Sequence, residues 1–83
     1  MKNLEGLVKK YRKKCNLHFT SINDIVIKEM YDEPISFSEQ KAIKNFYSLR
    51  VKYLKSAVNE NRFSKMATIS RLAANLVPYK EFI

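Results

Sequence analysis

Residues 36–58, SFSEQKAIKNFYSLRVKYLKSAV, decide the fold, because they are the longest run of this chain that fits a single helix. At about 100° per residue, the apolar side chains of this run sweep about 200° of the helix circumference. A helix that is apolar over more than half of its girth must be covered by two or more other elements. The run therefore predicts an all-α fold, a small bundle of about four helices around a central helix over residues 37–58.

The remaining arc of this helix is basic. It is about 80° wide on the helical wheel, and the residues four positions after its lysines are all uncharged, so no Glu relieves the repulsion between them. The lysines cover 14 residue steps, or about 21 Å of helix, which is long enough to follow several phosphates. We expect a nucleic-acid backbone to lie along this row, with an ordinary solvated face as the alternative. The row, named the lysine ridge below, consists of Lys41, Lys44, Lys52 and Lys55.

Composition limits the class of protein. With 83 residues, 46% of them apolar, and only one Gly and two Pro, the chain is expected to form one helical domain over 1–83. Its one Cys, Cys15, excludes an internal disulfide, and His18 alone beside it makes a zinc site improbable, so we expect no metal and no cofactor. No acid, base and nucleophile occur at the spacing of a catalytic set, so we expect no enzyme. No signal peptide or membrane span is recognisable, which predicts a cytoplasmic protein, or one of the host cytoplasm if it is viral.

The charge of +8 is unevenly distributed along the chain. Residues 1–15 carry +5, residues 16–40 carry −4 and residues 41–83 carry +7. A basic surface of this strength favours a polyanionic partner, and nucleic acid is the first choice, with DNA favoured over RNA. The high usage of Lys, Asn and Ile is typical of an AT-rich coding sequence and suggests a bacterium, a plasmid or a virus as the source.

The first fifteen residues predict an amphipathic helix over 2–15. Leu4, Leu7, Val8, Tyr11 and Cys15 follow helical spacing and form a narrow apolar stripe. The stripe lacks Trp and Phe and ends after four turns, so we do not expect a membrane partner. The basic residues around it are candidates for backbone contacts, with a solvated face again as the alternative: Lys9, Lys10, Arg12, Lys13 and Lys14.

A second helix is expected over 22–31, with Ser21 and Asp24 in a capping arrangement and Pro34 as the stop. The β-branched residues 25–27 would also suit a short buried strand, and this alternative stays open. Ser36 and Glu39 form a capping box for the central helix, and Phe37 is expected to pack over its entry.

Arg50 falls within the apolar arc of the central helix, so it should be buried and paired with an acid. The candidates stand at the end of the second helix: Glu29, Asp32 and Glu33.

The last helix is expected over 65–77, after a turn at 59–63 and with Ser64 as its cap. Its buried face should contain Met66, Ile69, Leu72, Ala73, Leu76 and Val77. Its other face is polar, with only small alanines between the polar side chains, as a recognition helix requires. Residues 38–77 thus resemble a helix-turn-helix, with three base-reading candidates: Thr68, Arg71 and Asn75.

These features predict a small basic DNA-binding regulator or accessory factor. The rival hypothesis is a protein-interaction module that binds and modulates a larger complex, because Tyr31, Tyr79 and Phe82 occur where burial is not assured. The apolar tail at 79–83 should fold back on the core or reach across to a second subunit, so a homodimer is also considered.

Overall fold

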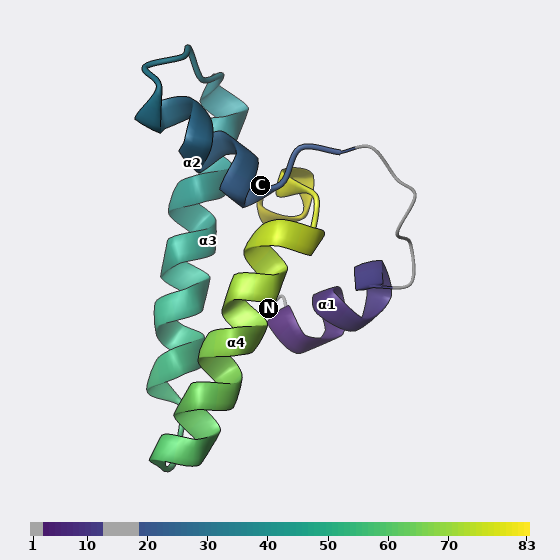
Figure 1. Ribbon diagram of the computed structural model, residues 1–83, viewed down its shortest axis with the longest axis vertical. Helices are drawn as coiled ribbons and strands as arrows, with labels where there is room; N and C mark the ends of the chain where they lie inside the picture. Colours follow the sequence, from purple (N-terminus) through teal and green to yellow (C-terminus); the bar gives the residue numbers. More distant parts are fainter. Residues whose placement is uncertain (1–2, 13–18) are drawn as a thin grey trace.

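A computed structural model of the chain describes residues 3–12 and 19–83 (Figure 1). These residues form four α-helices and a short 3₁₀ helix: α1 (Leu4–Arg12), α2 (Ile22–Met30), α3 (Phe37–Lys55), α4 (Glu60–Leu76) and η1 (Tyr79–Phe82). The prediction of a small all-α bundle with α3 as its longest member is confirmed.

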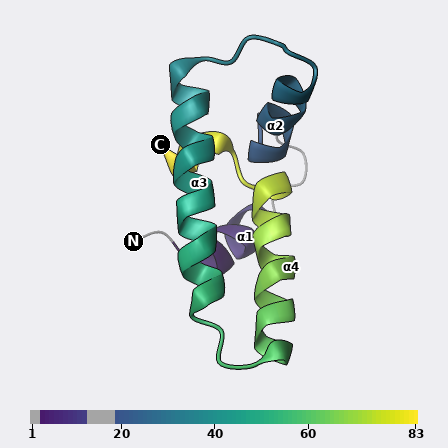
Figure 2. The ribbon, with the colours of Figure 1, turned by 90° about the vertical axis from the view of Figure 1, so that its left-hand side faces the viewer.

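The helices are arranged along an axis 39 Å long. In both views α3 and α4 lie side by side and run in opposite directions, joined by a short turn (Figures 1 and 2). The other elements cover this hairpin. α2 packs on the end of the hairpin opposite the turn, η1 packs on α3, and α1 packs mainly on α4. α3 is therefore contacted by α2, α4 and η1, as the width of its apolar arc predicts.

One continuous core joins these elements. Phe46 of α3 is almost fully buried, and its ring meets that of Phe82 edge to face, with the centroids 5.1 Å apart. Leu4, Ile25 and Val77 bring α1, α2 and the end of α4 into the same cluster. The tail at 79–83 therefore folds back on the core of its own chain.

Both predicted capping boxes are present. The Ser21 hydroxyl accepts from the Asp24 amide at 3.2 Å, and Asp24 in turn accepts from the Ser21 amide at 3.0 Å. Ser36 and Glu39 make the same reciprocal pair at the start of α3. Since α2 is a helix from its cap onward, the strand alternative at 25–27 is excluded.

The turn between the long helices lies earlier than predicted. α3 ends at Lys55 rather than at residue 58, and α4 begins at Glu60 rather than Lys65. The Asn59 side chain accepts from the Arg62 amide at 2.8 Å, so Asn59 is the N-cap, and Ser64 lies within the helix. The capping preference of Asn59 outweighs the low helix propensity of Asn61, which favours a turn.

Three predicted side-chain placements are wrong. Phe37 is exposed and does not cover the entry of α3, because it is the first residue inside the helix rather than the one before the cap. Leu72 is exposed because the buried stripe of α4 is centred on Met66, Ser70 and Ala73. The buried Ser70 satisfies its hydroxyl by donating to the Met66 carbonyl at 3.0 Å.

The third is Arg50, which is exposed, and the predicted ion pair with Glu29, Asp32 or Glu33 does not appear among the ion pairs of the described residues. An ion pair does connect α2 and α3, with the charges reversed. Lys28 of α2 lies 3.1 Å from Glu39 of α3, whose carboxylate is mostly buried.

The region 38–77 contains a helix, a turn and a helix, in the order predicted. The two helices form a long antiparallel hairpin (Figure 2). In the DNA-binding helix-turn-helix the two helices instead cross steeply, at about 90–120°. The geometry of this hairpin therefore gives no support of its own to insertion of α4 into a major groove.

Candidate nucleic-acid interface

The lysine ridge lies on one exposed side of α3. All four lysines are exposed, and α3 is unbroken from Phe37 to Lys55, so the row keeps its alignment. One edge of the ridge is bordered by η1, because Asn45 donates to the Phe82 carbonyl at 2.7 Å. Within the described part of the chain no ridge lysine forms an ion pair. Among the described residues the row therefore presents four cations without an ion-pair partner, although Glu5 of α1 lines the same hollow as Lys52.

The basic residues of α1 lie elsewhere. Lys9, Lys10 and Arg12 are exposed, whereas Lys13 and Lys14 lie outside the described residues. Lys10 lies 3.6 Å from Glu81, which also accepts from the Tyr11 hydroxyl. The C-terminal end of α1 points away from α3, beyond α4 (Figure 1). The two basic segments that the sequence assigned to one phosphate surface are thus separate.

The three base-reading candidates do share one exposed face of α4. Two of them donate to their own helix: Thr68 to the Ser64 carbonyl at 3.1 Å, and Asn75 to the Arg71 carbonyl at 3.0 Å. Arg71 makes only a 3.5 Å contact with the Thr68 hydroxyl. Since a guanidinium has five N–H donors, Arg71 keeps most of its capacity for a ligand.

A hollow of about 160 Å³ lies where α2, α3 and α4 meet, and no sequence pattern predicts it. Arg50 and Arg71 both line it, together with Asn23 and Tyr47, and no acid does. Two guanidinium groups from different helices beside one hollow are suited to a phosphate or carboxylate. The helical wheel places Arg50 among apolar neighbours, but it cannot show that three helix surfaces diverge at this point.

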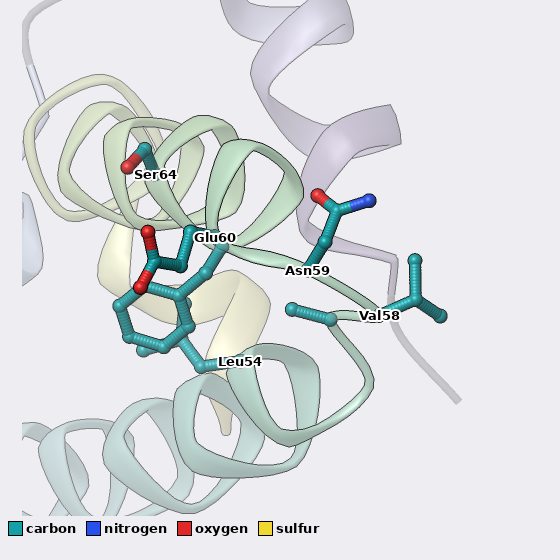
Figure 3. A pocket seen from close by; sticks show the side chains of 7 residues that line it. Leu54, Val58, Asn59, Glu60 and Ser64 are labelled. Carbon is teal, nitrogen blue, oxygen red and sulfur yellow. The ribbon is translucent and has the colours of Figure 1, made fainter.

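A second, shallow hollow of about 520 Å³ lies at the turn between α3 and α4. Figure 3 shows Leu54 and the Glu60 carboxylate on the same side of the turn, whereas Val58 lies on the other side and points away from them. Its lining is largely apolar with one acid, so it is not suited to a phosphate.

The third hollow, about 410 Å³, lies between the start of α1 and the second half of α3. The Tyr53 hydroxyl there is buried without a hydrogen-bond partner in the described structure, and burial raises its pKa. Residues 3–12 and 19–83 contain no group of three His, Cys, Asp or Glu side chains that could hold a metal ion. In the same residues no helix has the length and apolar character needed to cross a membrane.

Comparison with known proteins returns no match, whether against protein-family models, curated proteins or solved structures.

Proposed function

We propose that this protein binds nucleic acid, with duplex DNA as the preferred ligand, and that it acts as a regulator or accessory factor of a bacterial, plasmid or viral genome. The observation that carries the proposal is the lysine ridge. Four exposed lysines on one side of a single helix, none of them in an ion pair within the described residues, repel one another, and a bound polyanion would relieve that repulsion.

The length of the ridge suits a phosphate backbone. Its span of about 21 Å covers the rise of about six phosphates on one DNA strand, at about 3.4 Å each. Such contacts position a protein on DNA without reading its sequence. Arg50 and Arg71 line a hollow that lies about 150° around α3 from the ridge, so in this proposal they would contact a separate stretch of nucleic acid, where Arg71 is the candidate for reading bases.

A protein-interaction module remains the second candidate, supported by exposed apolar side chains. Of the three aromatics that suggested it, Phe82 is buried in the core and Tyr79 is half-buried, so only Tyr31 is freely exposed. Tyr47 and Val51 on α3 are exposed as well, and these support the candidate better than Tyr79 or Phe82.

The test compares two matched double variants, each lacking two positive charges. Lys44→Gln with Lys55→Gln removes half of the ridge, and Lys9→Gln with Arg12→Gln removes two exposed cations of α1, which is separate from the ridge. Binding of random duplex DNA and of single-stranded RNA is measured by fluorescence anisotropy between about 50 and 200 mM salt, a range over which phosphate-driven binding must weaken steeply. The ridge variant should bind more weakly, and its slope of log K against log salt should be shallower by about 0.9 for each phosphate that it no longer neutralises.

The quadruple change of all ridge lysines to Gln should remove most binding while leaving the fold intact. Parental affinity and slope in that variant would refute the proposal. Binding of RNA but not DNA would retain the ridge as the site and change the ligand. Binding of neither by the parent protein would leave the protein-interaction module as the better candidate.

A further inference from the structure

The side of α3 next to the lysine ridge carries large apolar side chains that are about half exposed. Tyr47 is 43% exposed and Val51 is 50% exposed, and they lie about 40° apart on the helix. Val58, just beyond the end of α3, is 85% exposed. We name these three residues the apolar strip. Adjacent exposed apolar side chains on a small domain are a candidate interaction surface.

One end of the strip continues into further apolar surface, and other apolar side chains are exposed at the opposite end of the molecule. At the turn between α3 and α4, the shallow hollow of Figure 3 is lined by Leu54, Val58 and Phe63. At the opposite end of the molecule, α2 ends in Met30, which is 75% exposed, and the equally exposed Tyr31. α2 and α4 lie on the same side of α3, because both line the hollow that contains Tyr47. One end therefore projects an apolar tip, and the other end has an apolar depression on the same side.

The two ends also differ in charge. Glu29, Asp32 and Glu33 surround the turn between α2 and α3. Apart from the ridge lysines, the other end of the hairpin carries two cations and one acid: Arg62, Lys65 and Glu60. Two copies aligned in parallel would place like charges together, whereas two antiparallel copies place the acidic end of each beside the basic end of the other.

We propose that the apolar strip binds a second copy of this chain, with the two α3 helices packed antiparallel about a twofold axis. An axis passing between positions 47 and 51 places Tyr47 of each copy against Val51 of the other. The same axis brings the Met30 and Tyr31 tip of each copy to the hollow at Leu54 and Phe63 of the other. Such an interface is isologous and closed, so assembly stops at the dimer.

This arrangement has a consequence for the lysine ridge, which rests on the proposed function. The twofold axis runs between the two antiparallel helices and is perpendicular to the plane that contains both. Rotation about this axis keeps a surface on one side of that plane on the same side. The ridge lies on one flank of the strip in each copy, so both ridges face the same way. The dimer then presents eight lysines, four from each copy, to one nucleic acid.

The first experiment measures mass in solution, without nucleic acid, by sedimentation equilibrium over a dilution series. The parent chain should show twice its 9.8 kDa at high concentration. Val51→Lys places a charge in the centre of the interface and should raise the dimer dissociation constant at least about tenfold. Leu72→Lys adds the same charge at an exposed apolar residue of α4 outside the strip and should leave the dimer intact. A parent that stays at 9.8 kDa, or equal dissociation in both variants, would overturn the proposal.

The second experiment tests the orientation with spin labels on single cysteines in a Cys15→Ser chain. Labels at Gln40→Cys should be offset by about 27 Å along the helix in the antiparallel dimer, and labels at Ser48→Cys by only about 3 Å. A parallel dimer would show no offset at either position, and that result would exclude the twofold packing described here.

The mass and label measurements do not depend on nucleic-acid binding, so the dimer and the proposed function fail separately. One further measurement tests whether the dimer contributes to nucleic-acid binding. Val51→Asn, which disrupts the interface without adding a charge beside the ridge, should bind DNA with a shallower salt slope than Leu72→Asn, because the monomer offers only one ridge. Equal slopes with an intact parental dimer would show that the two ridges do not act together.

Discussion

Lys28 and Glu39 join α2 to α3 through a charged contact of 3.1 Å, and the same carboxylate caps the start of α3. One oxygen of Glu39 accepts from the Ser36 amide at 3.0 Å while the other accepts from Lys28. Glu39 therefore has two separable roles. Its negative charge attracts Lys28 across the contact between the helices, and its oxygen atom accepts the capping hydrogen bond from the Ser36 amide.

Glu39→Gln should separate these roles, because Gln can still accept from the Ser36 amide but cannot form the ion pair. The hydrogen bond from Ser36 and then that from Lys28 hold the pKa of Glu39 below its ordinary value of 4.5, against the opposing effect of burial. A lowered pKa contributes stability that is present above the ordinary pKa and is lost as the pH falls through the folded value. At pH 7 Glu39→Gln should reduce the free energy of unfolding by about 1 kcal/mol. Urea titrations between pH 3 and pH 7 should show a flatter decline for the variant, and parallel curves would mean that Glu39 contributes no pH dependence.

Asn59→Ala should weaken the start of α4. The Asn59 side chain accepts from the Arg62 amide, and loss of an N-cap costs about 1 kcal/mol. Ser64→Ala is the matched control, because Ser64 lies inside the helix, where Ala is the better helix former. Thermal unfolding of both variants should show a loss for Asn59→Ala and none for Ser64→Ala. A loss of stability for Ser64→Ala and none for Asn59→Ala would instead identify Ser64 as the N-cap.

Phe82→Ala should be the most destabilising of these changes. Phe82 is buried against Phe46, and truncation of a buried Phe costs about 3–5 kcal/mol. The neighbouring Ile83 is half exposed, so Ile83→Ala should cost much less. Chemical denaturation of the two variants measures the difference. Similar small losses would show that the tail does not hold the core together.

Arg71→Ala should reveal whether α4 reads bases. Loss of a bidentate base contact costs about 1–3 kcal/mol on a preferred DNA site and much less on random DNA. Arg50→Ala provides the comparison, because Arg50 borders the same hollow from α3 and should weaken both ligands equally. Competition binding with a selected site and with random DNA separates the outcomes. If Arg71→Ala weakens binding to the selected site and to random DNA equally, Arg71 contacts phosphate rather than bases.

The features that could be predicted from the sequence are those set by neighbours in the chain. Ser21 with Asp24 and Ser36 with Glu39 are three residues apart, so their capping boxes follow from local geometry. The exposed lysines of α3 follow from helical periodicity in the same way.

The errors come from contacts between distant segments. Periodicity places Leu72 inside because it continues an apolar stripe, but the contacts of α4 with α1 and α3 set which side is buried. Periodicity also predicts that Arg50 is buried and paired, because Arg50 falls within the apolar arc of α3. It is exposed because it borders the hollow where α2, α3 and α4 meet, and helical periodicity cannot show that hollow. The predicted turn is misplaced because two candidate caps, Asn59 and Ser64, both suit the start of a helix.

The docking of α1 also affects the order in which the chain folds. Leu4 and Val8 of α1 are buried, α1 packs mainly on α4, and the Tyr11 hydroxyl donates to Glu81, which lies 70 residues further along. A nine-residue helix is not stable alone in water, so α1 has no lasting structure before those residues are made. At about 5–20 residues per second, a ribosome completes Glu81 about 4 to 14 seconds after Tyr11. α1 is therefore synthesised before the residues that it packs against, and it joins the fold only after them.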